Sequence, residues 1–314
     1  MIAVAGGYGV GMTMNVVRAP AAGETVAGGL LSIGPGGKGS NQAVAIRRLG
    51  AACTVFTAIG DDAAGLDARR LWADEGVDDS AVVVGRSATM TGFILVEPDG
   101  ENRIAIADGA LADLRVADVA GFAAAIRNAA LLVVSLEIPV PVATEALRLA
   151  RRSGTRTLLN PAPATDLDAG VLELVDVLTP NWPELARLAG ADAATSDPDA
   201  AIDRLRRTYS GAIVVTLGGD GVIVDDGDGR DRIPALSVAP VVDTTGAGDA
   251  FTAALAVALG EGRPLRDAAR FAVAAGAAAV TVAEVIPALP RRERVEKLLS
   301  AQTLGSAAIQ EGAR

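Results

Sequence analysis

The sequence predicts an α/β fold in which a mostly parallel sheet is covered by helices. Short apolar runs that look like strands alternate along the chain with segments of helical pattern, which is typical of βαβ units. A glycine or proline follows most of these strands, as at Gly60, Pro161 and Gly218. Hydrophobic residues make up 50% of the chain but aromatic residues only 3%, so we expect a core of Ala, Val and Leu.

The strands are expected at residues 2–5, 54–59, 131–136, 157–159, 174–179 and 213–217. Helices are expected at residues 42–49, 144–152 and 250–259. The lone Cys53 stands at the start of the second strand, where a small buried hydrophobe is a better interpretation than a nucleophile. Because ligands of such sheets bind at the carboxyl ends of the strands, the turns that follow them are the places to search for a site.

Two segments, about residues 10–33 and 82–107, lack a helical period. The second alternates apolar and polar residues, with Asp99-Gly100 as a hairpin turn. We interpret both as antiparallel insertions that form a small lid over a cleft, and the alternative is an edge extension of the main sheet. The chain is then one domain over residues 1–300, followed by a frayed tail at 301–314.

The composition excludes several kinds of chemistry. The 314 residues include no histidine, which rules out Ser-His-Asp and Cys-His catalysis and histidine-ligated metals. A net charge of −10 without a basic block argues against nucleic-acid binding. The apolar run at 271–283 is shorter than the ~20 residues that span a bilayer, and the N-terminus lacks a basic signal region. We therefore expect a cytoplasmic protein with no membrane partner.

The segment Asp243-Thr-Thr-Gly-Ala-Gly-Asp249 carries the strongest chemical signal. Apolar residues 238–242 predict a strand before it, and helix formers follow it. The free N–H groups of Gly246, Ala247 and Gly248 at a helix start would bind an anion. We expect the helix dipole to keep Asp249 ionised at neutral pH. The alternative is an ordinary capped helix.

A second glycine-rich turn, Gly34-Pro-Gly-Gly-Lys-Gly-Ser-Asn41, precedes a predicted helix. It is not a Walker A loop, because Ser32 stands where the first glycine belongs and Gly39 follows the lysine. Lys38 and Asn41 could bind the hydroxyls of a small ligand. The alternative is a flexible turn with a solvated lysine.

Taken together, three motifs in this order resemble the ribokinase-like, or PfkB, carbohydrate kinase family: Gly36-Gly-Lys-Gly-Ser-Asn-Gln-Ala43, Asn181-Trp-Pro-Glu184 and Asp243-Thr-Thr-Gly-Ala-Gly-Asp-Ala-Phe251. The resemblance runs from residue 2 to about residue 298. It implies a ribokinase-like three-layer α/β/α fold with a β-sheet lid. It also implies ATP- and Mg²⁺-dependent phosphorylation of a hydroxyl, expected to be a primary one, on a small sugar or sugar-like molecule.

The resemblance assigns roles to the residues that match the family's motifs. Asp249 is the general base, and the amides of residues 246–248 form the anion hole. The substrate-binding positions are Gly37, Lys38, Asn41 and Glu137, and the nucleotide positions are Asn181, Thr216, Gly218 and Gly221. Glu184 organises Mg²⁺ through water, and Asp243 with Thr245 surrounds a monovalent cation, usually K⁺. A surface cap remains the alternative for Glu137, and a helix-capping residue for Glu184.

The chain departs from the family at two places. Gly9 and Gly11 stand where the family has an asparagine and an aspartate that grip the sugar, and Tyr8 is either a stacking platform or a core residue. Near the C-terminus, Glu284 and Ala288 replace a glycine and a serine, which puts K⁺ activation in question. A nucleoside kinase of the same fold and a non-catalytic sugar- or nucleotide-binding protein remain open. The family also suggests a homodimer formed through the lid.

Overall fold

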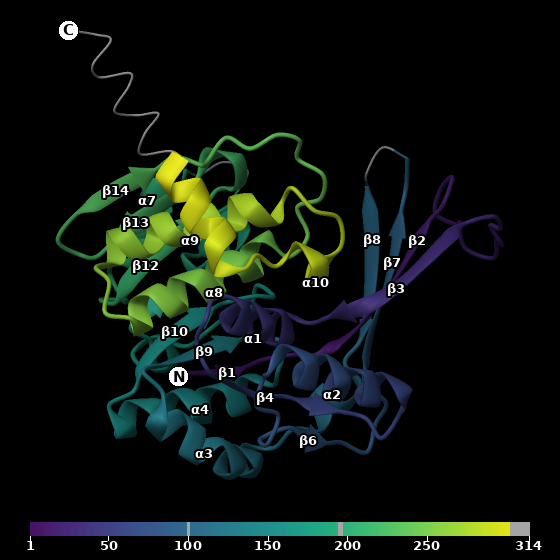
Figure 1. Cartoon of the computed structure of the whole chain (residues 1–314), viewed down its shortest axis with the longest axis horizontal. Coiled ribbons are helices and arrows are strands. Elements are labelled where there is room, and N and C mark those ends of the chain that lie inside the picture. The colour runs from purple at the N-terminus through teal and green to yellow at the C-terminus, as the bar shows by residue number, and fades with distance from the viewer. Residues whose placement is uncertain (99–100, 194–196, 302–314) are drawn as a thin grey trace, which may run out of the picture.

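A central eight-stranded sheet organises the molecule, with the strand order β14-β13-β12-β11-β10-β9-β1-β4 (Figure 1). The computed structural model describes residues 1–98, 101–193 and 197–301. The strands are β1 Ile2–Ala5, β4 Cys53–Phe56, β9 Leu131–Ser135, β10 Arg156–Asn160, β11 Val177–Leu178, β12 Ala212–Thr216, β13 Val222–Asp225 and β14 Arg230–Ile233. Pairing is parallel from β4 to β12 and antiparallel only at β13 and β14, which confirms the predicted mostly parallel sheet.

Helices follow the strands and return the chain to the next one. They are α1 Lys38–Arg48, α2 Ala63–Glu75, α3 Val119–Asn128, α4 Val140–Ser153, α5 Ala169–Leu172, α6 Trp182–Leu188, α7 Pro198–Leu205, α8 Ala247–Gly260, α9 Leu265–Ala279 and α10 Val285–Ala288. Short 3₁₀ turns occupy Gly109–Asp113, Val116–Asp118 and Gly218–Asp220. Within the described ranges, no helix has both the length and the apolar character needed to cross a bilayer. Apart from residue 301, the predicted tail lies outside the described residues.

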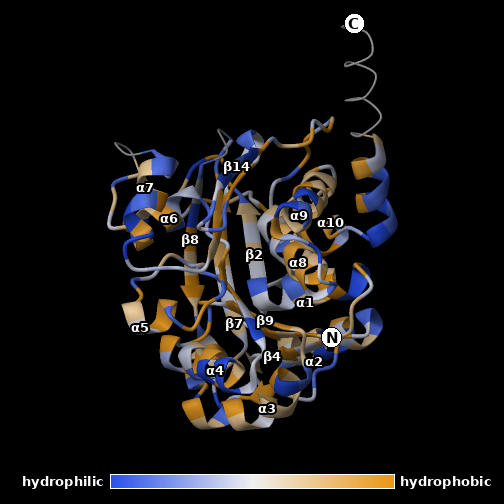
Figure 2. Ribbon diagram, turned by 90° about the vertical axis from the view of Figure 1, so that its left-hand side faces the viewer, coloured by the Kyte–Doolittle hydropathy of each residue, from blue (hydrophilic) through white to orange (hydrophobic). Residues whose placement is uncertain are grey.

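The sheet separates two hydrophobic cores, as expected for a three-layer fold. Side chains alternate between the two faces of a strand, so Ile2 and Val4 join one core while Ala3 and Ala5 join the other. Helices α1, α8 and α9 cover the first face, and α3, α4, α6 and α7 cover the second (Figure 2). Cys53 is 3% exposed within the first core, in agreement with its interpretation as a buried hydrophobe.

Helix α8 is buried from Asp249 to Leu259, because it packs between α1 and α9. Its sequence is accordingly hydrophobic on every side, which is the pattern of a fully buried helix. Burying an ionised side chain in such a helix is costly unless hydrogen bonds and opposite charges compensate for it. The position of Asp249 in this helix therefore requires an explanation from its neighbours.

A second sheet, with the order β3-β2-β7-β8, projects from the main body (Figure 1). Its strands are β2 Gly9–Asn15, β3 Leu30–Gly36, β7 Met90–Val96 and β8 Asn102–Ala107, which lie in and around the two segments that we predicted to leave the main fold. The β2/β3 and β7/β8 pairs are antiparallel, but β2 and β7 pair in parallel. Both of these strands run outward from the body, which explains their common direction. The predicted turn at Asp99-Gly100 lies outside the described residues.

Two strand predictions need correction. Residues 238–242, which we expected to form a strand before α8, have no regular structure. Pro240 has no N–H to donate to a sheet, and the amide of Val242 instead donates to the carbonyl of Val280 at 2.8 Å. The strand expected at 54–59 is divided at Thr57, after which β5 (Ala58–Ile59) pairs with β6 (Val83–Val84).

Candidate active site

The predicted site residues converge where the parallel strands end. The side-chain amide of Asn41 on α1 donates to Asp249 on α8 at 2.8 Å. Glu137, which follows β9, accepts from the backbone of Lys38 at 3.0 Å. The charge of Lys38 interacts with Asp249, Glu137 and Glu184. Residues separated by as much as 208 positions in sequence thus form one polar cluster in a largely apolar protein.

The N-terminus of α8 presents free amides. Its cap, Gly246, has φ 79°, a left-handed conformation that favours glycine, and a Cβ there would approach Val285 Cγ1 to 3.0 Å. Among the residues that the structure describes, the N–H groups of Gly246 and Gly248 have no hydrogen-bond partner. The N–H of Ala247 donates to Thr244 at 3.3 Å. Two of the three predicted anion-hole amides are therefore unengaged, and the third closes a turn.

Asp249 lies in the first turn of α8 and is only 6% exposed. Its Oδ2 accepts from Asn41 Nδ2 at 2.8 Å, and its Oδ1 accepts from Gln42 Nε2 at 3.2 Å. Burial raises the pKa of Asp249 above the usual value, and the charge of Lys38 and the two amide donors oppose this effect. The ionisation of Asp249 at neutral pH, which we expected from the helix dipole, stays a prediction; the opposing effect of burial arises because the side chain is enclosed by protein rather than placed at an open helix end.

Glu137, in the loop after β9, accepts hydrogen bonds from the N-terminal backbone of α1 and so caps a helix that is distant in sequence. It is not the surface cap that we considered as an alternative. Its Oε1 accepts from the N–H of Lys38 at 3.0 Å, and its Oε2 accepts from the N–H groups of Gly7 at 3.0 Å and Gly39 at 3.2 Å. These bonds join the end of β1 to the start of α1, where the backbones of Gly6 and Gly39 are too close to leave room for a Cβ. Burial raises the pKa of Glu137. Contact between Glu137 and a sugar stays a prediction.

Asn181 and Glu184 form a capping box at the start of α6. Asn181 Oδ1 accepts from the N–H of Glu184 at 2.8 Å, and the carboxylate of Glu184 accepts from the N–H and the side-chain amide of Asn181 at 2.9 and 3.0 Å. Burial raises the pKa of Glu184, which also faces Lys38 and Asp249. The capping alternative is correct for the local structure. It leaves a role toward Mg²⁺ open, because each carboxylate oxygen keeps a further lone pair.

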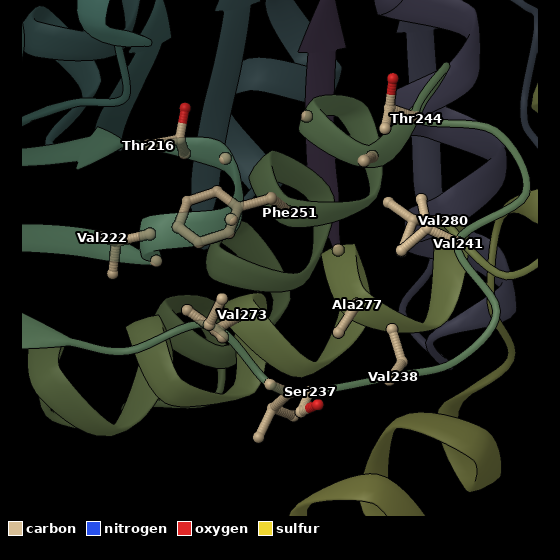
Figure 3. A pocket seen from close by; sticks show the side chains of 18 residues that line it. Thr216, Val222, Ser237, Val238, Val241, Thr244, Phe251, Val273, Ala277 and Val280 are labelled. Atoms are coloured by element: carbon tan, nitrogen blue, oxygen red, sulfur yellow. The ribbon is translucent and has the colours of Figure 1, made fainter.

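A cavity of about 590 Å³ opens beside the free end of α8 (Figure 3). Ala247 and Gly248 line one part of it, and the predicted nucleotide residues Thr216, Gly218 and Gly221 line another. The remaining wall is mainly apolar and was not predicted: Val222, Val238, Val241, Phe251, Val273, Ala277 and Val280. The sequence signals for this wall were the apolar runs at 238–242, which we interpreted as a strand, and at 271–283, which we interpreted as a run too short to span a bilayer. Asn181 does not line the cavity, but its backbone pairs with that of Thr216 in an isolated parallel β-bridge.

We expect Ala277→Leu to raise the KM for ATP about tenfold or more, because added methyl groups overfill an apolar site at a cost of about 1–3 kcal/mol. The side chain of Ala277 lies on the wall of the cavity (Figure 3), which Asp249 does not line, so kcat should change little. Steady-state kinetics at varied ATP concentration measure this effect. Ala124→Leu on the exposed side of α3 is the matched control. An unchanged KM in Ala277→Leu would mean that the nucleotide binds elsewhere.

Asp243 and Thr245 lie in contact at the loop before α8. Asp243 Oδ1 accepts from the N–H and the hydroxyl of Thr245 at 2.9 and 2.6 Å, and its Oδ2 accepts from the N–H of Glu284 at 3.2 Å. These hydrogen bonds lower the pKa of Asp243 even though burial acts in the opposite direction. Glu284 has φ 67°, the conformation for which a glycine is favoured.

Tyr8 is a core residue. It is 1% exposed, and its ring contacts Trp72 edge-to-face at 5.2 Å between centroids. Its hydroxyl donates to the carbonyl of Ala64 at 3.3 Å. It cannot serve as the stacking platform that we considered from the sequence.

A buried carboxylate beside unengaged helix amides, next to a cavity of the size that small-molecule sites have, is the arrangement expected of an α/β phosphotransferase. A sequence model described as pfkB family carbohydrate kinase matches residues 9–292. The chain therefore belongs to the PfkB family of carbohydrate kinases, as the motifs indicated.

Known relatives agree over most of the chain. It is 35% identical to the ribokinase of Haemophilus influenzae over 281 residues, which cover 88% of this chain and 91% of that protein. It is 34% identical to the ribokinase of Bacillus subtilis over 300 residues, covering 95% and 99%. The solved structure of Arabidopsis thaliana ribokinase complexed with ribose and ATP has a TM-score of 0.86 at 31% identity, covering 95% of this chain and 98% of that one. The ribokinase-like fold is thereby confirmed.

Proposed function

We propose that this kinase transfers the γ-phosphoryl group of ATP to a primary hydroxyl of a small sugar, with Asp249 as the general base. The observation that carries this proposal is the buried carboxylate of Asp249 beside the free amides of Gly246 and Gly248. The relatives named ribokinase, one of them solved with ribose and ATP, support the choice of a sugar and of ATP. A coupled assay of ADP release, run over pentoses, hexoses and nucleosides, tests it.

In this mechanism the acceptor hydroxyl donates its hydrogen bond to Asp249, which takes the proton as the oxygen attacks the γ-phosphorus, while the bond from that phosphorus to the β–γ bridging oxygen breaks and ADP leaves. Asn41 orients the carboxylate through its 2.8 Å hydrogen bond. The amides of Gly246 and Gly248 donate hydrogen bonds to the negatively charged oxygens of the transferring phosphoryl group. Such preorganised electrostatic stabilisation of the transition state is the main source of catalysis in phosphoryl transfer. Lys38 offsets the charge of the surrounding carboxylates.

The residues present fit a Mg²⁺ ion held mainly by phosphates and water. The described part of the chain contains no group of three or more acidic or cysteine side chains that could hold a metal by themselves. Mg²⁺ in kinases binds through one or two carboxylates, water and substrate phosphates, so the single buried Glu184 is sufficient. When bound, the ion would neutralise charge on the phosphates. Glu184 would orient its water shell while Asn181 holds the carboxylate in place.

Asp243 and Thr245 provide oxygen ligands of the kind that K⁺ accepts, and their mutual contact supports a shared role. The N–H of Glu284 already occupies Asp243 Oδ2, so the loop around residue 284 is joined to this position. We propose that a monovalent cation bound there would brace the turn before α8. Equal turnover in KCl and in tetramethylammonium chloride would exclude this.

The identity of the acceptor depends on the first lid strand. Gly11 pairs with Gly34 on one side and Gly92 on the other, and a Cβ at Gly11 would have no neighbour closer than 3.8 Å. A Cβ at Gly9 would instead approach Met90 atoms to 2.4–2.7 Å. The asparagine and aspartate side chains with which the family binds sugar hydroxyls are thus absent at Gly9 and Gly11. The space that a side chain at residue 9 would need is occupied by Met90.

We expect Gly11→Asp to raise kcat/KM for D-ribose about tenfold or more, because a carboxylate bonded to sugar hydroxyls is worth about 1.5–3 kcal/mol. The wild-type enzyme, which lacks this carboxylate, should then prefer an acceptor that has fewer hydroxyls in the region facing residue 11. Thr13→Asp is the matched control, because it adds the same charge two residues further along the same face of β2. If the two variants use D-ribose equally poorly, residue 11 does not face the sugar.

We also propose that the second sheet acts as a lid and as a dimer contact. Leu31, Ile33 and Phe93 share one of its faces and are 52–59% exposed. Exposed apolar clusters of this kind are typical of protein interfaces. A monomer by light scattering at assay concentrations would contradict the dimer.

In the substrate assay, ligand binding without phosphorylation of any compound would favour a non-catalytic binding protein, and activity on nucleosides alone would favour a nucleoside kinase.

A further inference from the structure

Gln42 follows the predicted substrate residue Asn41 and was given no role from the sequence. In the structure it has no exposed surface. Its Nε2 lies 3.2 Å from Asp249 Oδ1 and 3.2 Å from Asn160 Oδ1, so the two hydrogens of one amide group serve two acceptors. Asn160 ends β10 and is 8% exposed. A chain of side chains thus leads from the interior of the sheet to Asp249.

The direction of the hydrogen bonds in this chain is fixed at its inner end. Asn160 Nδ2 donates to the backbone carbonyl of Thr179 at 3.0 Å, and a carbonyl can only accept. The oxygen of Asn160 must therefore face Gln42, which in turn must present its N–H groups to both neighbours. The opposite orientation of Gln42 would place three acceptor oxygens together. In this orientation Gln42 Oε1 is buried and has no hydrogen-bond partner in the described structure. The donor orientation is therefore kept although it leaves one buried acceptor unsatisfied.

We propose that Gln42, held by Asn160, is a positioning residue for phosphoryl transfer: it fixes the rotation of the Asp249 carboxylate and favours its ionised form. This inference rests on the proposed role of Asp249. Because Gln42 is fully enclosed, it acts through Asp249 and not by touching the acceptor. Asn41, at Oδ2, and Gln42, at Oδ1, together hold both oxygens, and each oxygen retains a lone pair for the proton of the acceptor hydroxyl.

The need for such a donor follows from the surrounding charges. Burial, and with it the charge of Asp249, raises the pKa of Glu137, after β9, and of Glu184, on α6. Lys38 on α1 opposes them. A neutral amide that donates to Asp249 adds stabilisation to the ionised form without adding another charge to the cluster.

The test compares Gln42→Met and Gln42→Glu with the wild-type enzyme by following kcat and sugar KM against pH. Met keeps the length of the side chain but cannot donate, so kcat should fall about 10- to 100-fold with sugar KM changed less than about threefold. Loss of a hydrogen bond to the ionised form raises the pKa of Asp249, so the acidic limb of kcat should move up by about one pH unit. In Gln42→Glu a further carboxylate faces Asp249, and the limb should move further in the same direction.

Ser40→Ala is the structural control, because Ser40 is equally buried on the same helix but accepts from Trp72 Nε1 at 2.9 Å instead of contacting Asp249. It should lower Tm without moving the acidic limb. If Gln42→Met does not fold, Asn160→Ala removes the support of Gln42 and should shift the limb in the same direction. Acidic limbs that coincide with that of the wild type in every folded variant would overturn the inference. The proposed function fails separately, if Asp249→Asn keeps its activity.

Discussion

Asp249→Asn should bind ATP normally and lose kcat by about 10³-fold, since a general base typically contributes 10²–10⁴-fold. The substitution keeps the size of the side chain but removes the only carboxylate that α8 places beside its free amides. Asp249 does not line the cavity in which we expect the nucleotide to bind, so the Kd for ATP should stay within about twofold. Single-turnover kinetics with the preferred sugar, together with calorimetric titration of a non-hydrolysable ATP analogue, separate the two effects.

The matched control for this variant is Asp267→Asn on α9, where the carboxylate is exposed and pairs with Arg270. It should leave kcat unchanged. Asp249→Asn should also retain its fold, because removing a buried carboxylate removes a desolvation cost along with the hydrogen bonds. Turnover of Asp249→Asn within about tenfold of the wild type would contradict the mechanism, whereas loss of ATP binding would point to a structural role for Asp249.

Much of the fold could be predicted because local patterns determine it. The parallel strands are short runs of Val, Ile and Leu buried on both faces, such as residues 131–135, and this pattern survives in any tertiary context. Residues 238–242 show where the pattern fails. Val238 and Val241 line a cavity instead of a core, and Val241 remains 61% exposed, so composition alone could not distinguish this segment from a strand.

The site was predictable to the extent that it consists of glycine turns and charged side chains. Asp249, Lys38 and Asn41, which the structure brings together, were selected from the sequence because they lie beside predicted helix starts and match the motifs of the PfkB family. Gln42 and Asn160 were missed, since their pairing joins positions 118 residues apart and depends on the packing of α1 against the sheet. The rise that burial causes in the pKa of Asp249 was not foreseen for the same reason, because only the folded structure shows how completely α8 is enclosed.

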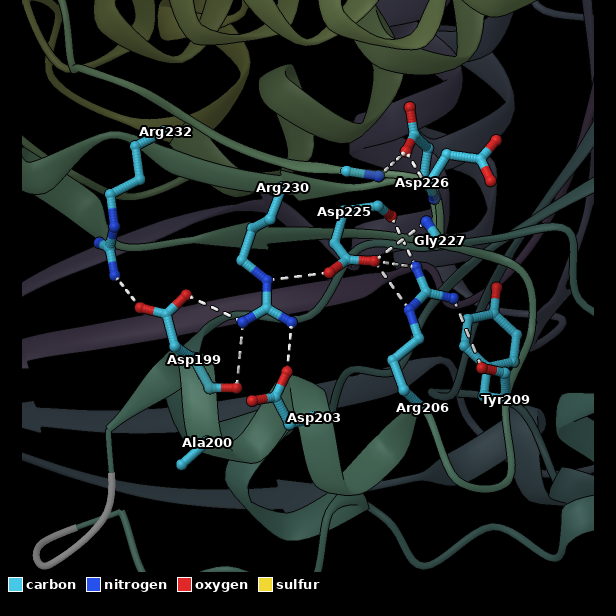
Figure 4. Close-up of polar contacts among 12 residues, drawn as sticks. Asp199, Ala200, Asp203, Arg206, Tyr209, Asp225, Asp226, Gly227, Arg230 and Arg232 are labelled. Atoms are coloured by element: carbon cyan, nitrogen blue, oxygen red, sulfur yellow. Dashed lines mark hydrogen bonds and ion pairs between the residues drawn. The ribbon is translucent and has the colours of Figure 1, made fainter.

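The largest effect on stability is expected far from the site, at Asp225. This carboxylate ends β13 and is enclosed by Arg206 from α7's C-terminal side and Arg230 from β14 (Figure 4). It accepts from Arg206 Nε at 2.7 Å, from Arg230 Nε at 2.8 Å and from the N–H of Gly227 at 3.1 Å. The network joins the antiparallel edge of the sheet to α7.

Asp225→Ala should lower the free energy of unfolding by about 1.5–3 kcal/mol, the usual contribution of hydrogen bonds to charged groups, because Arg206 loses its carboxylate partner while Arg230 keeps Asp199 and Asp203. Asp203→Ala is the matched control: it removes a 71% exposed partner of the same Arg230 and should cost less than about 1 kcal/mol.

Burial opposes ionisation of Asp225, but the bonds from Arg230 and Arg206 outweigh it and lower the pKa of this group. Its contribution is therefore complete above about pH 4, the value for an unfolded aspartate, and is lost as the pH falls. Urea denaturation at pH 7 and at about pH 3 should show the difference between wild type and Asp225→Ala shrinking in acid, and a difference independent of pH would show that Asp225 acts through packing and not through its charge.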